Sequence, residues 1–294
     1  MKLYAPSYYK KFKCIADKCE HSCCIGWEID IDSESLEKYR TLEGGYGDVI
    51  RSSISYDGEP HFILDSCERC PHLDGRGLCK IIINVGEGYL CDICREHPRF
   101  YNFTDVAEVG IGMSCPEGAR VILSSPDYHL LDEIGQVSAD TGGDYFDGRA
   151  ERGRVYELLR GVGEDYGTRL ENIYREYRIP VDDDSVWSEK IASLEYLNGE
   201  HRNLFMRYSS KRRPAGVDEY LERSLGYFIY RHCTEAFDAE DFRIRLRFCL
   251  FCERLLASLA VLRGAESLDG IAALASIISE EIEYSDDNTL SLTY

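Results

Sequence analysis

Residues 14–24 read CIADKCEHSCC, and this stretch brings four cysteines together as Cys14-x4-Cys19-x3-Cys23-Cys24. Spacings of this kind let neighbouring thiolates point at one ion from a single turn of chain. Thiolate is a soft ligand that selects zinc, copper(I) or iron–sulfur clusters. Two such half-sites from separate segments build a four-thiolate site. The stretch therefore predicts that the N-terminal part of the chain is organised around a bound metal.

Two further cysteine patterns follow it. One is Cys67-x2-Cys70 with Cys79 downstream, and the other is Cys91-x2-Cys94, with Cys115 and a proline further on. Ten of the chain's 13 cysteines lie in this first part, before residue 116. Buried free thiols are the alternative for any single cysteine, but so many at ligand spacing favour one or two metal sites.

The spacing of the cysteines does not decide between zinc and an iron–sulfur cluster. The Cys67/Cys70 and Cys91/Cys94 pairs are typical of zinc knuckles. The adjacent Cys23-Cys24 pair is less usual for zinc and favours an iron–sulfur cluster. Three histidines lie near these cysteines, namely His21, His72 and His97. Each could bind the metal directly, but we expect them to orient ligands or to serve a structural role.

Composition bounds the class of protein. The chain has 294 residues and 44% hydrophobic residues, enough for a real core. No signal peptide and no long uncharged apolar stretch is visible, so we expect no transmembrane segment and a cytoplasmic location. In a reducing cytosol, cysteines indicate metal or redox chemistry rather than disulfides. The net charge of -19 argues against nucleic acid as a partner.

The elements predict an α+β fold in two parts. Residues 1–125 form a cysteine-rich metal domain of short strands and helices, residues 126–150 a linker, and residues 151–294 a mainly α-helical domain. Alternation over residues 27–31 predicts a strand, and residues 100–113 a hairpin. The helical part shows its clearest apolar stripe at three- and four-residue steps, through Ile244, Phe248, Phe251, Leu255, Leu259 and Leu262. We expect Cys233, Cys249 and Cys252 to be buried in this helical core rather than to bind metal.

The cysteine motifs and their surroundings resemble the flagellin lysine-N-methylase family, within the wider group of cysteine-rich zinc- or iron-chelating proteins. The resemblance covers roughly the first 120 residues. The matching stretches are CIADKCEHSCCIGW at residues 14–27, CPHLDGRGLCKI at residues 70–81, GEGYL at residues 86–90, CREHPR at residues 94–99 and SCPEGA at residues 114–119.

This resemblance implies a 4Fe–4S cluster, with zinc as the alternative. It also implies transfer of methyl groups from S-adenosylmethionine to lysine side chains of flagellin, in the cytosol. Cys67 and Cys91 are extra to the family pattern. The cysteines that match it, and that the resemblance marks as metal ligands, are Cys14, Cys19, Cys23, Cys24, Cys70, Cys79, Cys94 and Cys115.

Other functions remain open beside a methyltransferase. The glycines of residues 161–167 lack the preceding strand that a dinucleotide-binding loop needs, and no other cosubstrate loop is recognisable. A non-catalytic, metal-stabilised interaction module and an electron-transfer protein are therefore the alternatives. The Cys-x3-Cys-x2-Cys signature of radical S-adenosylmethionine enzymes is absent, so the cluster either binds the cosubstrate or is structural. The sequence names neither a catalytic base nor an oligomeric state.

Overall fold

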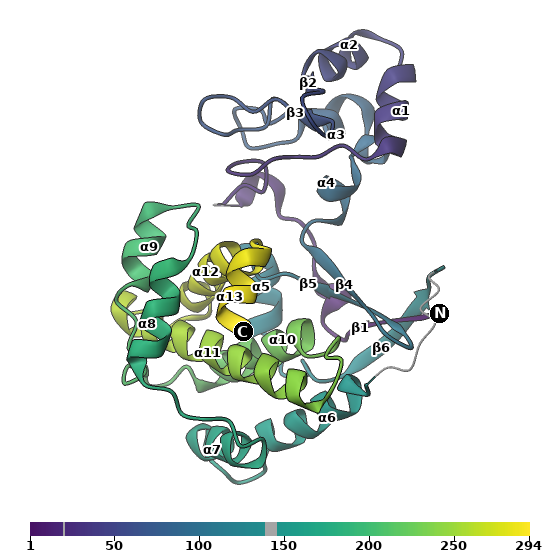
Figure 1. Cartoon of the computed structure of the whole chain (residues 1–294). Helices are drawn as coiled ribbons and strands as arrows, with labels where there is room; N and C mark the ends of the chain where they lie inside the picture. The colour runs from purple at the N-terminus through teal and green to yellow at the C-terminus, as the bar shows by residue number, and fades with distance from the viewer. Residues whose placement is uncertain (20, 139–145) are drawn as a thin grey trace. The chain divides into compact units, whose positions relative to one another are not determined.

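A computed structural model describes residues 1–19, 21–138 and 146–294 (Figure 1). The described residues form a mixed fold with many helices, one four-stranded sheet and one two-stranded sheet. It divides into two compact units. Residues 13–98 form one, here called the cysteine-rich unit, and residues 1–12 together with 99–294 form the other, here called the helical unit. No helix of the described residues is long and apolar enough to cross a membrane.

The cysteine-rich unit is built from short elements. β2 and β3 pair antiparallel, with Ile54 opposite Phe62 and Ser55 opposite His61. Its elements in chain order are the 3₁₀ turn η2 (Ala16–Lys18), α1 (Ser33–Thr41), α2 (Gly45–Ser52), β2 (Ile54–Ser55), β3 (His61–Phe62), α3 (Lys80–Val85), the 3₁₀ turn η3 (Glu87–Tyr89) and α4 (Asp92–Glu96).

The start of this unit follows its sequence signals closely. Asp32 caps α1, because its carboxylate accepts a hydrogen bond from the Ser35 amide at 2.9 Å. Before it, Ile29 and Ile31 are buried and the residues between and before them are exposed, as the alternating pattern predicts. The segment forms only an isolated bridge, Asp30 to His61, rather than the regular strand we expected. Pairing at the single position of Asp30 and His61 does not make a regular strand.

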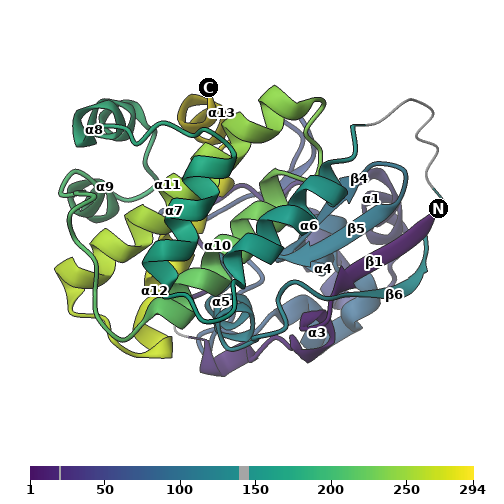
Figure 2. The ribbon, with the colours of Figure 1, turned by 90° about the horizontal axis from the view of Figure 1, so that it is seen from below.

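The helical unit contains a four-stranded sheet in the order β4-β5-β1-β6 (Figure 2). The expected hairpin over residues 100–113 is confirmed, since β4 and β5 pair antiparallel from Arg99–Ile111 to Phe103–Ala107. β1 runs parallel to β5 and antiparallel to β6. All residues of β5 are buried. The strands are β1 (Lys2–Pro6), β4 (Arg99–Phe103), β5 (Ala107–Ile111) and β6 (Leu131–Gln136).

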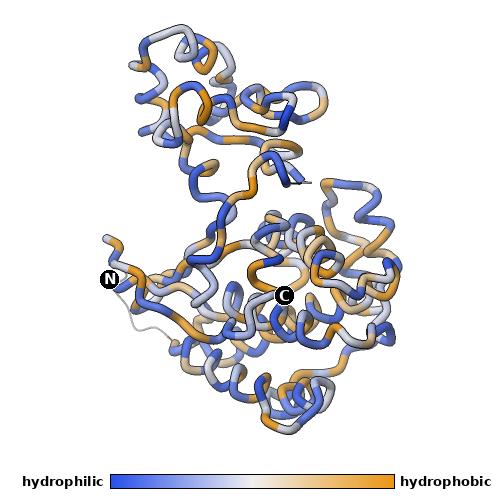
Figure 3. The backbone as a smooth tube through the Cα atoms, turned by 180° about the vertical axis from the view of Figure 1, so that it is seen from behind, coloured by the Kyte–Doolittle hydropathy of each residue, from blue (hydrophilic) through white to orange (hydrophobic). Residues whose placement is uncertain are grey.

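Helices make up the rest of this unit, and α11 follows the apolar stripe read from the sequence. Figure 3 shows hydrophilic and hydrophobic residues alternating along these helical segments. Cys233, Cys249 and Cys252 are fully buried, as expected. The elements are the 3₁₀ turn η1 (Tyr9–Lys11), α5 (Pro116–Leu123), α6 (Gly148–Leu159), α7 (Tyr166–Glu176), α8 (Asp184–Ser193), α9 (Gly199–Phe205), α10 (Asp218–His232), α11 (Ala239–Arg263), α12 (Leu268–Ile278), the π-helical turn η4 (Ser279–Glu283) and α13 (Asp286–Thr293).

The division into units does not coincide with the boundary we expected at residues 126–150. Residues 1–12 and 99–125 lie in the helical unit, because β1 and the β4–β5 hairpin form one sheet with β6. β6 itself falls inside the stretch that composition marks as a linker. Residues 139–145 of that expected linker lie outside the described residues.

Candidate metal centre

Thiols form part of the core of the cysteine-rich unit. Cys70 and Cys91 are buried in it, and Cys24, Cys79 and Cys94 pack against it partly buried. They share this core with apolar side chains of α1, α2, α3, the β2–β3 pair, the segment before α1 and the turn before α3, which are Ile29, Ile31, Leu36, Tyr39, Ile50, Ile54, Phe62, Leu73 and Ile81. Five cysteines from three separate stretches of sequence are therefore gathered around one core.

Backbone pairing brings the first two stretches together. The Cys70 amide donates to the Cys24 carbonyl at 2.8 Å, and the Gly26 amide donates to the Glu68 carbonyl at 3.0 Å. An isolated antiparallel bridge joins Ile25 to the segment of Glu68 and Cys70. The two cysteine motifs thus lie side by side because their main chains satisfy each other's hydrogen bonds.

A tight turn returns Cys79 towards Cys70. The Asp74 amide donates to the Leu78 carbonyl at 2.9 Å, and the Asp74 carboxylate accepts from the amides of Arg76 and Leu78 at 2.8 and 2.9 Å. This is the Asx-type turn chemistry that an Asp-Gly-x-Gly sequence favours. The bridge that follows pairs Leu73 with Cys79, and α3 begins directly after it.

The third stretch supplies Cys91 and Cys94 from the start of α4. Cys91 is the N-cap residue of α4, and the Cys94 amide donates to its carbonyl at 3.1 Å. The Asp92 amide donates to the Asp32 carboxylate at 2.8 Å, which ties α4 to the cap of α1. The x2 spacing therefore places both thiols on one side of a single helical turn, where the Cys91 thiol raises the pKa of Cys94.

The thiols affect each other's ionisation. Burial, together with the charges of Cys79 and Cys91, raises the pKa of Cys70 to about 11, although the His72 amide acts in the opposite direction. The hydrogen bond to Cys91 and then burial raise the pKa of Cys94 far above its ordinary value, while the same hydrogen bond lowers that of Cys91. Burial raises the pKa of Cys79. Loss of one thiol proton thus disfavours loss of the next, and a bound metal cation would offset this repulsion between thiolates.

The donor set therefore fits a sulfur-preferring ion or cluster. All 13 cysteines are free thiols, so no disulfide competes for these sulfurs. Among residues 1–19, 21–138 and 146–294, no three His, Cys, Asp or Glu side chains are already arranged as ligands of one metal ion. The structure thus gathers the donors in one core, while the identity of the ligands stays a prediction.

The remaining sequence-predicted ligands are not part of this core. Cys14 is exposed and Cys19 is partly exposed, in the segment around η2. The neighbouring Cys24 thiol, and then burial, raise the pKa of Cys23 well above its ordinary value. Cys115 is the N-cap residue of α5 and belongs to the helical unit.

Cys91 is the residue that the family pattern misses. The motifs leave Cys67 and Cys91 alike as extras, but the structure separates them. Cys67 is exposed in a turn where its amide donates to the Asp65 carboxylate at 2.8 Å, whereas Cys91 is 1% exposed within the thiol-containing core. The spacing of Cys91 from Cys94, typical of a ligand pair, was the signal that could have found it.

His72 has a structural role here. Its Nδ1 lies 3.0 Å from the Tyr46 hydroxyl and its Nε2 lies 2.9 Å from the Ser53 hydroxyl. Burial lowers the pKa of His72 to about 4, so the ring is neutral at physiological pH. Since both ring nitrogens have hydrogen-bond partners, this histidine fixes α2 beside the thiols, as the structural interpretation predicts.

Comparison with known proteins adds the family relation. A segment of this chain is 27% identical over 137 residues to the Lysine-N-methylase of Salmonella typhimurium (strain LT2) and equally to that of Salmonella choleraesuis. The match covers 44% of this chain and 34% of each relative, so it spans about a third of their length. The Flagellar biosynthetic protein FliU of Salmonella muenchen is also 27% identical, over 80% of its length.

No family model and no solved structure matches the chain. The resemblance read from the cysteine motifs is confirmed by these named relatives, at a distant level of identity.

Proposed function

We propose that this chain, as a distant relative of the lysine-N-methylases, transfers methyl groups from S-adenosylmethionine to lysine side chains of flagellin. The observation that carries the proposal is the similarity to two proteins named lysine-N-methylase. The flagellar name of the third relative supports flagellin as the substrate. A cytosolic location fits the proposed activity and its substrate, because the exposed thiols of the chain stay reduced in the cytosol.

We further propose that the thiols of the cysteine-rich core hold a 4Fe–4S cluster, with zinc as the alternative. The residues that would hold it are drawn from Cys24, Cys70, Cys79, Cys91 and Cys94, which share one core. When bound, such a cluster cross-links three stretches of chain through sulfur and can offer an open iron position to amino and carboxylate groups. The chain's own contribution is to gather these sulfurs and to shield them from water.

The chemistry of the transfer sets what the site must do. The amine of lysine attacks the methyl carbon, the bond from that carbon to the sulfonium breaks, and the thioether leaves with the electron pair. A lysine ammonium, with a pKa near 10.4 when unperturbed, must first give its proton to a base or to water. The nucleophile and methyl carbon must meet in line at about 3 Å.

A direct assay tests the activity. Protein prepared without oxygen is incubated with flagellin and methyl-labelled S-adenosylmethionine, and the lysines of flagellin are analysed by mass spectrometry. We expect label on lysine side chains. Flagellin that stays unlabelled in the presence of folded, metal-loaded protein contradicts the proposed activity.

The metal proposal is tested with two matched variants. Cys91→Ser removes a buried thiol of the core and should lower the iron content, whereas Cys67→Ser removes an exposed thiol and should leave the metal content unchanged. Metal analysis and the visible absorption of the cluster measure both. Equal metal content in the two variants would show that Cys91 is not a metal ligand. A colourless protein that contains zinc would show that the bound metal is zinc rather than an iron–sulfur cluster.

A non-catalytic, flagellin-binding module is the second candidate. The flagellar biosynthetic name of one relative favours it, because that name states no enzymatic activity. It predicts that the purified protein binds flagellin in a pull-down with and without S-adenosylmethionine, while no lysine is methylated.

A further inference from the structure

Three exposed aromatic side chains lie at one edge of the sheet in the helical unit. They are Tyr101 and Phe103 of β4 and Phe237 of the turn between α10 and α11, and they are 39%, 40% and 70% exposed. Single exposed apolar side chains are common on proteins and need no explanation. Three aromatic side chains at the edge strand of a sheet are the residue type that protein interfaces favour.

Side-chain alternation along β4 directs two of these rings away from the helices. The Phe100 ring lies 5.9 Å from the Tyr230 ring, and the Asn102 amide donates to the Tyr230 carbonyl at 3.2 Å, so Phe100 and Asn102 face α10. Tyr101 and Phe103 therefore lie on the opposite face, where their rings stack with centroids 6.2 Å apart. Neither ring belongs to the hydrophobic core of the helical unit.

A hydrogen bond ties the turn that carries Phe237 to the end of β4. The Phe103 amide donates to the Glu235 carboxylate at 2.8 Å, and Phe237 follows two residues later. The Phe237 amide donates to the buried carboxylate of Asp241 at 3.2 Å, which fixes the backbone at this point. Since Ala236 is buried and Phe237 is exposed, the turn directs its large side chain to solvent beside the end of β4.

Carboxylates lie close to these rings. Asp105 follows β4 with 70% of its side chain exposed, and its ion pair with Arg149 is long, at 3.8 Å. Glu235 forms no ion pair within the part of the chain that the structure describes. Asp238 comes directly after Phe237 and is the N-cap residue of α11. The rings are therefore bordered by negative charge on both the strand and the turn.

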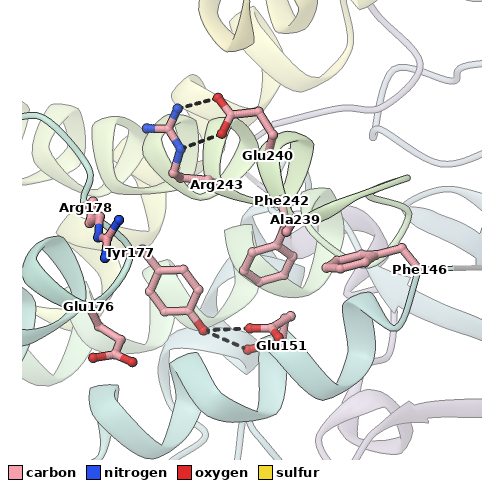
Figure 4. Close-up of a pocket in the computed structure, with 9 residues that line it drawn as sticks. All are labelled: Phe146, Glu151, Glu176, Tyr177, Arg178, Ala239, Glu240, Phe242 and Arg243. Carbon is pink, nitrogen blue, oxygen red and sulfur yellow. Dashed lines mark hydrogen bonds and ion pairs between the residues drawn. The ribbon is translucent and has the colours of Figure 1, made fainter.

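The basic side chains at the start of α11 already have partners. Arg243 and Glu240 line a small pocket there and pair with each other, with the Arg243 Nε donating at 3.0 Å (Figure 4). Arg245 donates to the Asp241 carboxylate at 2.8 Å. These arginines therefore do not cancel the charge of the carboxylates beside the rings. Aromatic ring faces and carboxylates both attract cations.

We propose that this aromatic–acidic surface, formed by Tyr101, Phe103, Phe237, Asp105 and Glu235, binds a basic segment of a partner protein. Lysine or arginine side chains of the partner would lie against the rings and face the carboxylates. A second copy of this chain fits the surface less well, because the net charge of -19 makes two copies repel each other. The proposal does not depend on methyl transfer, since it concerns binding alone.

The test measures binding of a synthetic peptide to the full, metal-loaded chain. A short fluorescent peptide of alternating lysine and glycine is titrated with protein, and its anisotropy is followed at low and at high salt. The same peptide with glutamate in place of lysine is the negative probe. We expect the lysine peptide to bind, the glutamate peptide not to bind, and salt to weaken the binding.

Two variants test whether the peptide binds at this surface. Phe237→Ser removes the most exposed ring. Glu235→Gln removes one charge and keeps an oxygen that can accept the hydrogen bond from the Phe103 amide. We expect each change to weaken binding about two- to fivefold, which is the contribution of an exposed cation–π contact or ion pair.

Leu197→Ser and Glu200→Gln are the matched controls. Leu197 is 68% exposed, close to the exposure of Phe237, and Glu200 is also exposed. Both lie at the start of α9, on the side of the helical unit away from β4 (Figures 1 and 2). Their replacement should leave binding unchanged. Thermal unfolding checks that all four variants are folded.

Each outcome decides for or against the surface. Equal weakening in the surface variants and the controls would show that net charge alone attracts the peptide, and a wild type that does not bind it would also overturn the proposal. Self-association of the wild type that Phe237→Ser abolishes would assign the surface to a second copy instead. If the surface variants alone lose binding while flagellin is never labelled, the surface is confirmed and the proposed activity is wrong.

Discussion

Two buried glutamates in the helical unit show opposite effects of burial. Burial alone would raise the pKa of Glu283, but the charge of Arg231 and the hydrogen bond from His232 outweigh it and lower the pKa to about 2. The Tyr227 hydroxyl also donates to Glu283, at 2.8 Å. Glu253 pairs with Arg213 at 3.0 Å, yet burial raises its pKa, and one of its oxygens has no partner within the described residues.

Replacing Glu283 should therefore cost more stability than replacing Glu253. We expect Glu283→Gln to lower the free energy of unfolding by about 3–5 kcal/mol, because it leaves the largely buried guanidinium of Arg231 unpaired. Glu253→Gln should cost less, since the charge it removes is already disfavoured and Arg213 is about a third exposed. Denaturant unfolding measures both changes. A larger loss for Glu253→Gln would contradict this ranking of the two carboxylates.

The lowered pKa of Glu283 also predicts a pH dependence. A carboxyl group whose folded pKa lies below its unfolded pKa stabilises the protein above the unfolded value, and this stabilisation is lost as the pH falls through the folded value. The pKa of Glu283 falls from its ordinary value of 4.5 to about 2 on folding. This shift corresponds to roughly 3 kcal/mol of folding stability, which is lost as the pH falls across that range. We expect the stability gap between wild type and Glu283→Gln to narrow as the pH falls from about 5. A gap that stays constant would exclude this titration.

At the scale of elements, the contact between α5 and the end of β5 depends on a glycine. A Cβ atom at Gly118 would lie 2.7 Å from the carbonyl oxygen of Gly112 and 2.9 Å from Cγ2 of Ile111. The carbonyl belongs to backbone and cannot move away as a flexible side chain could. This close approach positions α5, and with it Cys115 at its N-cap.

Gly118→Ala should destabilise the helical unit by about 1–3 kcal/mol through overpacking, although alanine is the better helix former. Gly153→Ala in α6 is the control, because no atom lies within 4 Å of the position of its Cβ. We expect it to stabilise the protein by up to about 1 kcal/mol. Thermal unfolding compares them, and a stabilising Gly118→Ala would mean that α5 can shift freely.

Elements also show how far periodicity alone can predict. The stripe through residues 244–262 lies within the long helix α11, as the periodicity predicts. Between Leu246 and Ala260 only Arg247 and Arg254 are not buried, so the helix is enclosed on more sides than the stripe predicts. The alternation at residues 27–31 correctly predicts which side chains are buried, but the segment is not a regular strand. Forming a strand needs a partner along its whole length, and no pattern within the segment supplies one.

At the scale of the whole molecule, the two units have separate hydrophobic cores. The core of the helical unit combines side chains of the sheet, of α5 and of the later helices. The core of the cysteine-rich unit is smaller; it includes two buried thiols and has three more packed against it. A small core gains stability from metal more than a large one does.

Metal removal should consequently loosen one unit only. We expect chelation to increase amide hydrogen exchange within residues 13–98 and to leave residues 99–294 nearly unchanged. Hydrogen–deuterium exchange with mass spectrometry, before and after metal is stripped, measures this by segment. The Cys67→Ser variant serves as a metal-retaining control. An equal increase in both units would show that the metal supports the whole chain.

The sequence by itself determined that the thiols concentrate in the first part of the chain, that their motifs match the lysine-N-methylases and that the later part is helical. These are local properties, set by spacing and periodicity. Only the tertiary structure decided that Cys91 joins the core while Cys67 stays exposed, and that residues 1–12 and 99–125 belong with the helices. Such choices depend on which distant segments satisfy each other's backbone hydrogen bonds and bury each other's side chains, and spacing along the chain does not encode that.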